Sequence, residues 1–201
     1  MDFLTLAILA AMGGFGLNAY DQRQRIALLG SHLSNYQVEK LMEALTQGYL
    51  RALGEKDAER RDQIWGLLGS TEAQLCSQFE RFANEFSKVD AEQARVSTLP
   101  AGLPYASRWW PQASFDLRAM FKLHAQGLAR AVENSANRSP RDKAFTVSAE
   151  LFLMQHSCHW FCKSKNVASA RLLVRHQTAY AQVLDAVGSE TRAAYDKLVN
   201  G

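Results

Sequence analysis

The longest uncharged run of the chain is residues 3–20, eighteen residues rich in Leu, Ile, Met and Phe. Asp21, Arg23 and Arg25 follow this run at once. As a helix, the run would be about 27 Å long, close to the roughly 30 Å of hydrocarbon in a typical bilayer. We therefore expect a single transmembrane helix. Because the arginines follow it, the main domain is predicted to be cytoplasmic and the N-terminus outside.

Three other interpretations of residues 3–20 are open. Three glycines and the modest length of the run also fit a buried core helix. Residues 14–19 have the glycine pattern of a dinucleotide-binding turn, but no strand is evident on either side of the following helix. A cleaved signal peptide requires basic residues before its apolar part, and none precedes this run in the sequence. The membrane helix is the favoured interpretation.

From residue 26 onward, apolar residues recur at helical spacing almost everywhere. One amphipathic helix is predicted to begin near residue 33 and to end near residue 54. The same pattern covers residues 64–86, where Gly66 and Gly69 favour a kink or break and Ser70 is a candidate cap for the later piece.

The second half of the chain shows the same helical pattern. A helix is predicted over residues 115–133, followed by a turn. The Ser-Pro pair at positions 139 and 140 predicts a helix start, with the proline in the first turn, and this helix should run to about residue 165. Two more helices are expected, over residues 168–187 and 189–199.

The predicted fold class is all-α, because β-branched residues are sparse and alternating runs are absent. We expect an N-terminal single transmembrane helix followed by an antiparallel helical bundle of about five to seven helices. The predicted parts are a membrane anchor at residues 1–20, an N-terminal helical part at 21–98, a Pro/Trp loop at 99–113 and a C-terminal helical part at 114–201. Residues 21–201 should form one domain.

Composition supports a folded protein, with 47% apolar and 21% charged residues. The net charge of +3 is unevenly placed, since the first hundred residues carry ten basic and thirteen acidic side chains and the remainder carry thirteen and seven. We expect the acidic first half and the basic second half to attract each other within one fold. The alternative is that a basic face of the second half binds anionic lipid headgroups. Nucleic acid is not expected, because no dense basic stripe is present. Three cysteines do not suggest a disulfide scaffold and agree with a cytoplasmic domain.

The predicted helix 140–165 is apolar nearly all round, so other helices should surround it. Within it, Cys158, His159 and Cys162 share one side at spacings of three and four residues. Together with His124 or His176 they are a candidate set of ligands for zinc, or for haem. Ordinary core packing is the favoured interpretation, because a second pair of closely spaced ligands is missing.

The Pro/Trp loop contains two adjacent tryptophans, Trp109 and Trp110, directly after Arg108. We expect them to pack over the gap between the two helical parts, with contact to a partner or to the membrane interface as the alternative. A basic group, formed by Lys163, Lys165, Arg171 and Arg175, is a second candidate contact for lipid headgroups or an acidic partner, although a solvated surface is the commoner explanation.

No phosphate loop, nucleophile elbow or zinc-protease motif is present in the sequence, so no catalytic residue is predicted. The expected function is that of a membrane-tethered scaffold, adaptor or assembly component acting through protein–protein contacts. Its predicted contacts are Arg108, Trp109, Trp110 and the basic group. The alternative is a helical sensor, or a ligand- or metal-binding domain, with its site near Cys158, His159 and Cys162.

Overall fold

The computed structural model describes residues 3–100 and 102–201, except for the side chains of Phe3 and Ala10. Helices account for 78% of the structure and strands for 3%, which confirms the all-α class. In the described chain there are nine helices and two strands: α1 (Phe3–Leu33), α2 (Val38–Gly54), α3 (Ala58–Phe86), β1 (Arg95–Ser97), α4 (Ala106–Trp109), β2 (Ser114–Asp116), α5 (Leu117–Glu133), α6 (Pro140–Cys162), α7 (Lys165–His176), α8 (Tyr180–Ala186) and α9 (Ser189–Asn200).

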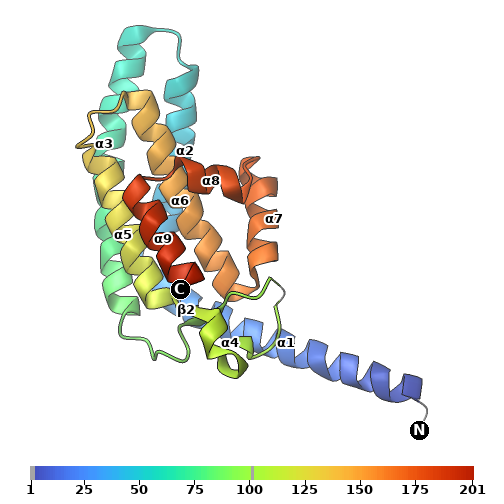
Figure 1. Ribbon diagram of the computed structural model, residues 1–201. Helices are drawn as coiled ribbons and strands as arrows, with labels where there is room; N and C mark the ends of the chain where they lie inside the picture. Colours follow the sequence, from blue (N-terminus) through green and yellow to red (C-terminus); the bar gives the residue numbers. More distant parts are fainter. Residues whose placement is uncertain (1–2, 101) are drawn as a thin grey trace.

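The body of the molecule is a bundle built around α6, which contacts α1, α2, α5, α7 and α8 (Figure 1). Helices α2 and α3 form a hairpin along one side, α5 packs between α3 and α6, and α9 packs on α5. The centre of the core is aromatic, with rings of Phe82, Phe86 and Phe121 in edge-to-face contact. The prediction that other helices surround residues 140–165 is therefore confirmed.

The predicted break in the second helical run is wrong, because α3 continues through Gly66 and Gly69. The helix stays intact because Leu68, Leu75 and other residues on one face are buried against the core. This burial outweighs a cost of about 1 kcal/mol for each glycine inside a helix. Ser70 is not a cap, and the helix begins instead at Asp57, whose carboxylate accepts a hydrogen bond from the N–H of Arg60.

The helix start at Pro140 is confirmed, since the Ser139 hydroxyl accepts a hydrogen bond from the Asp142 N–H. The predicted ends further on are less accurate. Helix α6 stops at Cys162 because Ser164 caps the next helix, and the segment predicted as one helix over residues 168–187 is divided into α7 and α8. The division occurs at Gln177, whose backbone has a left-handed φ of 53°.

The Pro/Trp loop connects the two strands of a small antiparallel sheet that the sequence pattern did not predict. Val96 lies opposite Phe115, and both are buried. Strands of three residues are too short to show alternation in the sequence. The sheet holds the two ends of the loop together beside α6, because the Trp160 indole N–H donates to the Ser97 carbonyl at 2.9 Å.

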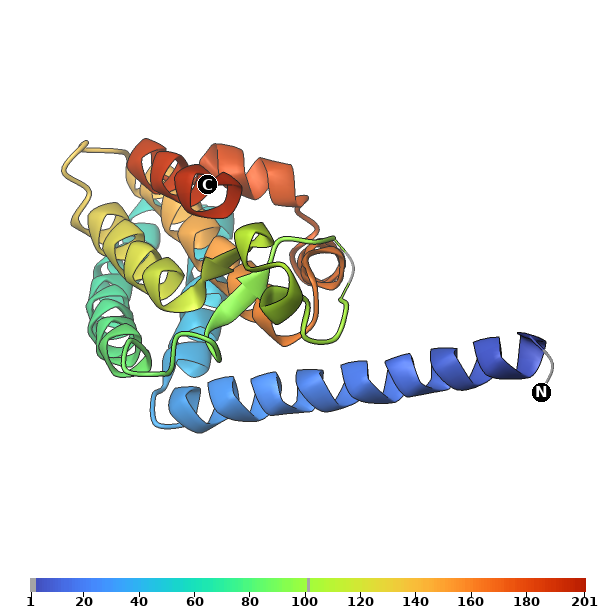
Figure 2. The ribbon, with the colours of Figure 1, turned by 60° about the horizontal axis from the view of Figure 1, so that its bottom comes forward.

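Helix α1 is a single helix whose second half packs on the body and whose first half projects away from it (Figure 2). The predicted anchor is therefore the start of a longer helix. Among the residues described, no helix has both the length and the hydropathy needed to cross a membrane. The expectation of a transmembrane helix at residues 3–20 gains no support from this result. Glycines 13, 14 and 16 and the polar Asn18 reduce the apolar character of this segment.

Candidate functional site at the base of the long helix

The projecting half of α1, residues 3–20, exposes large apolar side chains over more than half of the helix circumference and carries no charged residue. The side chain of Phe15, for example, is 78% exposed. At 100° per residue these eight positions cover about 220° of the helix circumference, and the rest of it includes Ala7, Ala11, Gly14 and Asn18. No charged side chain lies on any face of residues 3–20. The exposed large apolar residues of this half are Leu4, Leu6, Ile8, Leu9, Met12, Phe15, Leu17 and Tyr20.

The second half of α1, residues 21–33, is held on the body. Leu29 is buried in the core, and Leu28 and Leu33 pack against it. At the end of the helix, the His32 ring lies 3.0 Å from a Glu85 carboxylate oxygen, and the other oxygen accepts a hydrogen bond from the Tyr36 hydroxyl. These bonds to His32 and Tyr36 lower the pKa of Glu85. The docked half is therefore fixed by both apolar and polar contacts.

Arg25, in the docked half of α1, joins this helix to β1 and to the Pro/Trp loop. Its guanidinium bonds Asp21 within α1 at 3.1 Å, the Arg95 carbonyl at 3.1 Å and the Ser107 hydroxyl at 3.2 Å. The same group lies over the Phe161 ring, 5.3 Å from its centroid. One side chain thus connects α1, β1, α4 and α6 at the point where α1 leaves the body.

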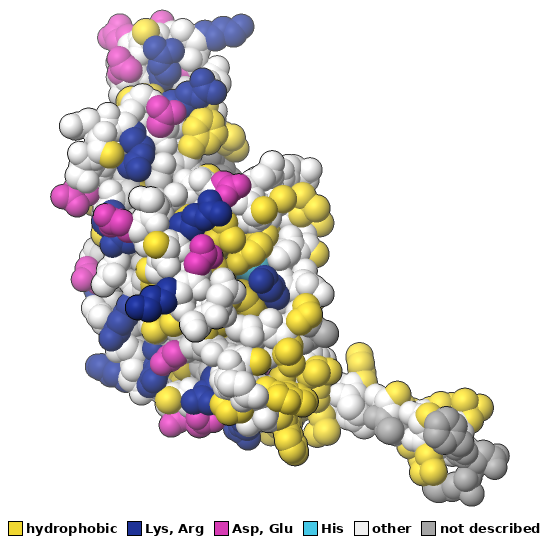
Figure 3. All heavy atoms as spheres, viewed as in Figure 1, with side chains coloured by type: hydrophobic (Ala, Val, Ile, Leu, Met, Phe, Trp, Pro, Cys, Tyr) yellow, Lys and Arg dark blue, Asp and Glu magenta, His cyan; other side chains and the backbone are white. Residues whose placement is uncertain are grey.

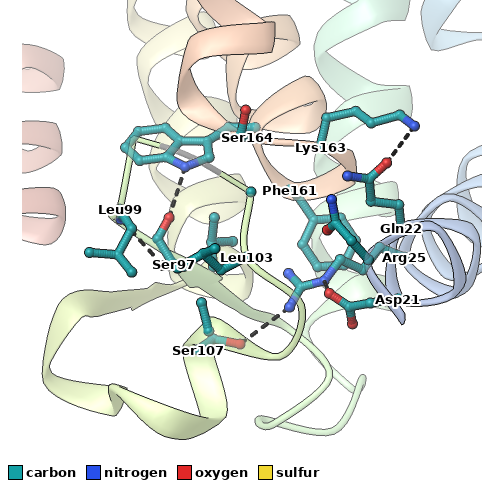
Figure 4. Close-up of a pocket in the computed structure, with 15 residues that line it drawn as sticks. Asp21, Gln22, Arg25, Ser97, Leu99, Leu103, Ser107, Phe161, Lys163 and Ser164 are labelled. Atoms are coloured by element: carbon teal, nitrogen blue, oxygen red, sulfur yellow. Dashed lines mark hydrogen bonds and ion pairs between the residues drawn. The ribbon is translucent and has the colours of Figure 1, made fainter. Parts of the chain in front are cut away.

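A second polar contact at the base of α1 is made by Lys163, whose ammonium donates to the Gln22 side-chain oxygen at 2.6 Å (Figure 4). Between these groups lies a cavity of about 30 Å³, lined partly by Arg25, Ser107 and Ser164. That volume accommodates about one water molecule. This cavity is therefore too small for an organic ligand.

We call residues 103–110 the tryptophan corner; they lie beside the base of α1, where Ser107 contacts Arg25. Trp109 is 73% exposed and Trp110 47% exposed, so the expectation that they pack over the gap between the helical parts is wrong. The physical reason is that α4 turns its other face inward, with Ala106 and Ser107 buried. Because Ser107 is the residue bonded to Arg25, the corner has a fixed position relative to α1.

Cationic side chains accompany the apolar ones at this end of the molecule. Arg23 and Arg108 are exposed, and Lys163 is half-buried. In the described part of the chain, none of the three forms an ion pair with an acidic residue. Arg108 instead lies over the Tyr105 ring, 5.3 Å from its centroid. The base of α1 thus combines exposed aromatic rings with cations whose charge is not neutralised.

The predicted basic group is divided by the structure, because only Lys163 faces α1. Lys165 lies over the rings of Trp160 and Tyr180, with its ammonium 5.1 and 5.3 Å from their centroids. Arg171 donates to the His159 ring at 3.1 Å, and Arg175 is exposed on α7. Lys165 therefore has a packing role, and Arg171 and Arg175 belong to a separate surface.

The candidate metal ligands do not converge. His159 bonds Arg171, while His176 lies 2.7 Å from the Gln155 side-chain oxygen and stacks on Phe152. Burial raises the pKa of Cys162 to about 11 and raises that of Cys158 as well, so both thiols are held protonated. Among the described residues, no group of three or more His, Cys, Asp or Glu side chains is arranged to hold a metal.

Sequence reasoning missed an ionic cluster between helices α2, α3 and α6. Glu72 is buried, and its carboxylate accepts hydrogen bonds from the Tyr49 hydroxyl and the Lys143 ammonium, both at 2.5 Å. A buried carboxylate with two donors is a structural cross-link between the helices that supply them. Its partners lie 23 and 71 residues away, so no local spacing could have revealed it.

A second buried polar group is Glu150, in the middle of α6. One carboxylate oxygen accepts a hydrogen bond from the Gly188 N–H at 3.0 Å, at the start of α9, and the other has no hydrogen-bond partner among the described residues. Burial raises the pKa of this carboxyl. There is no room for a side chain at Gly127, where an added Cβ would lie 2.6 Å from Glu150 and 2.5 Å from Thr191. Glu150 therefore caps α9 across the bundle.

Two histidines are buried near the same end of the core. His124 lies 2.9 Å from the Ser157 hydroxyl, and His156 lies 3.0 Å from the Ser169 hydroxyl. Burial lowers the pKa of each to about 3, and each ring has one nitrogen without a partner in the described structure. Both rings are therefore neutral at physiological pH and act as polar core residues.

Comparisons of the chain with protein-family models, with characterised proteins and with solved structures found no match. The base of α1 and the apolar helix that projects from it set this molecule apart from an ordinary helical bundle. A function is therefore inferred from the geometry of these two parts.

Proposed function

We propose that the protein is a membrane-tethered helical scaffold or adaptor, in which residues 3–20 insert into a membrane and the bundle presents contact surfaces beside it. The body is proposed to lie on the cytoplasmic side, with the arginines that follow the apolar run at the inner surface. A tethered body meets membrane-bound partners at a raised effective concentration, which is the advantage of such an arrangement for assembly.

The observation that carries the proposal is the exposure of large apolar side chains over more than half of the circumference of the projecting half of α1, with no charged side chain on the remainder. Burying a large apolar side chain is worth about 1.5–3 kcal/mol, so eight of them in water are strongly unfavourable. A groove on one protein would cover a single face of the helix. An environment that is apolar on every side, such as lipid, satisfies the whole circumference.

A candidate surface for protein contacts lies on α7, away from the core. Leu173 and Val174 are exposed there, the latter by 77%, and Arg171 and Arg175 flank them. Arginine is enriched in protein interfaces, and adjacent exposed apolar side chains offer surface that a partner can bury. We propose this face as the contact surface for a protein partner with an acidic rim.

The tether is tested by membrane fractionation with an alkaline carbonate wash. The full-length chain is compared with a chain lacking residues 1–20 and with a chain of unchanged length in which Leu9 and Phe15 are both replaced by glutamine. We expect only the unaltered chain to stay in the washed membrane. One variant lacks the apolar helix, and the other places two polar side chains on it. Circular dichroism must show that each variant keeps a folded bundle.

Two results would contradict the tether. If the unaltered chain is released by the wash as readily as its variants, residues 3–20 do not insert. If the shortened chain fails to fold while the full-length chain is soluble, these residues belong to the core of the fold. Protease protection of the bundle in sealed right-side-out vesicles tests the orientation, since a cytoplasmic body is protected and an external body is digested.

The α7 surface is tested separately by proximity labelling from the membrane-bound chain. Val174→Glu should reduce labelling of an acidic partner, because it adds a negative charge to the centre of the surface. Leu67→Glu, at a similarly exposed leucine on the α2–α3 hairpin, is the matched control. Equal loss in both variants, or no loss in either, would remove α7 as the contact surface.

A further inference from the structure

We infer that the tryptophan corner binds the anionic lipid–water interface, so that the corner and the projecting half of α1 form one membrane-contacting surface. This inference rests on the proposed membrane tether and identifies the partner of the corner. Space-filling Figure 3 shows apolar side chains gathered at the end of the body from which α1 leaves and continuing along that helix.

The depth of the corner follows from its attachment to α1. Arg25 comes five residues after Tyr20, the last residue of the uncharged run, which is about 7.5 Å further along a helix. The headgroup layer on each side of the hydrocarbon is about 5–8 Å thick. When residues 3–20 lie in hydrocarbon, Arg25 therefore lies at the headgroups, and so does Ser107, which it bonds at 3.2 Å.

The corner cannot swing far from this position. Ser107 and Ala106 are buried, and the loop begins and ends in the small sheet that pairs Val96 with Phe115. The ring of Trp160, which donates to the Ser97 carbonyl, holds that sheet on α6. Trp109 and Trp110 follow Ser107 directly, so insertion of α1 brings their exposed rings to the membrane surface.

The chemistry of the corner suits that depth. Indole rings combine a large apolar face with one N–H donor, and tryptophan is enriched at both boundaries of the membrane for this reason. The nearby cations Arg23, Arg108 and Lys163 have no acidic partner in the described chain, and each basic residue near a surface adds attraction to anionic lipid. Both the exposed indole rings and the nearby cations therefore favour an anionic lipid headgroup layer as the partner of the corner.

A protein partner fits this position less well, because the inserted helix would bring lipid headgroups against the corner before any soluble protein reached it. A second copy of the chain would need to approach along the membrane and bury the same unpaired cations against its own. An anionic headgroup layer neutralises these cations and covers both rings without such a conflict.

The test uses the full-length chain reconstituted into vesicles of phosphatidylcholine, with or without phosphatidylglycerol, and measures quenching of tryptophan emission by brominated acyl chains. The sequence has four tryptophans, of which Trp160 is buried and Trp65 is in α3. We expect the double variant Trp109→Phe and Trp110→Phe to lose most of the quenching. Trp65→Phe is the matched control and should keep it.

The same quenching assay tests whether charge contributes to the binding of the corner. Phosphatidylglycerol should increase the quenching of the unaltered chain, and Arg108→Gln should remove most of this increase. Arg60→Gln, on the first turn of α3, is the control that should leave the increase unchanged. Equal quenching in both lipid mixtures, with no effect of Arg108→Gln, would overturn the preference for anionic lipid.

The outcomes separate this inference from the proposed tether. If the chain stays with the vesicles but its quenching is the same after both corner tryptophans are replaced, the corner does not contact lipid and the inference fails while the tether stands. If the unaltered chain does not stay with the vesicles at all, the tether and the inference fail together. Strong quenching of Trp65 would place a different end of the bundle on the membrane and also overturn the inference.

Discussion

The two halves of α1 belong to one unbroken helix with the same backbone hydrogen bonding, yet they relate to the rest of the molecule in opposite ways. Residues 21–33 bury Leu29 and bond the body through Arg25 and His32. Residues 3–20 expose almost every large side chain. A helix satisfies its own backbone polar groups in either setting, so the environment is chosen by the side chains alone.

This contrast has a consequence for stability. Contacts of the docked half contribute to the free energy of unfolding of the bundle, because they are lost when the bundle unfolds. Side chains of the projecting half contribute almost nothing to it, because they touch nothing that unfolding would remove. The two halves should therefore respond differently to the same perturbation.

The largest difference is expected in acid, which should destabilise the bundle and leave the projecting half unaffected. Burial lowers the pKa of His124 and His156 from about 6.5 to about 3, so the unfolded chain binds more protons than the folded chain between these values. Stability is therefore full above about pH 6.5 and is lost as the pH falls. At pH 5 the loss should be about 2 kcal/mol for each histidine.

The measurement is urea unfolding at pH 7 and pH 5. His124→Leu should roughly halve the pH dependence, since it leaves one of the two buried rings. Residues 3–20 contain no histidine or acidic group, so helicity of this half in detergent micelles should not change between the two pH values. Unfolding that is independent of pH over this range would show that both rings remain hydrated in the folded protein.

The second difference is expected when one leucine is truncated in each half. Leu29→Ala should lower the free energy of unfolding by about 2–4 kcal/mol, because it leaves a cavity in the core. Leu9→Ala should change it by less than about 0.5 kcal/mol. Chemical denaturation of both variants in the same detergent measures the pair, and equal effects would mean that the projecting half also packs on the body.

How much of this contrast the sequence revealed depends on the range of the contacts involved. The apolar run at residues 3–20 and the cap at Ser139 are local patterns and were found directly. The continuity of α1 across Asp21 and Arg23 was not, because a change from apolar to charged residues resembles the end of a membrane helix. The bond between Arg25 and Ser107 joins positions 82 residues apart, and no spacing rule predicts it.

The tryptophan corner is a second case in which the sequence pattern could not predict the outcome, because tertiary contacts decide it. The residues Arg108, Trp109 and Trp110 were singled out by type, but their exposure depended on which face of α4 turns inward. Ala106 and Ser107 lie on the inward face, where the Ser107 hydroxyl accepts a hydrogen bond from Arg25. Composition therefore identified the candidate residues, and only tertiary contact determined their orientation.

The third prediction concerns the boundary between the two halves. Arg25→Ala removes bonds to the Arg95 carbonyl and the Ser107 hydroxyl, and should lower the free energy of unfolding by about 1–3 kcal/mol. Arg23→Ala is the control, because Arg23 is exposed and should cost less than about 0.5 kcal/mol. Limited proteolysis should also cut the loop faster in the Arg25 variant, and equal rates in both variants would show that this side chain does not hold the corner.

The smallest effect should come from replacing a glycine in the projecting half. No atom lies within 4 Å of the position that a Cβ would occupy at Gly14, so Gly14→Ala can only favour the helical backbone, by about 1 kcal/mol. Amide hydrogen exchange around residue 14 should slow by about fivefold, while the free energy of unfolding of the bundle stays unchanged. Gly127→Ala offers the opposite case, because its Cβ would meet Glu150 and Thr191 and should destabilise the whole bundle. If Gly14→Ala instead stabilised the bundle, the projecting half would be coupled to the body through contacts that the exposed side chains do not show, and the division of α1 into two independent halves would be wrong.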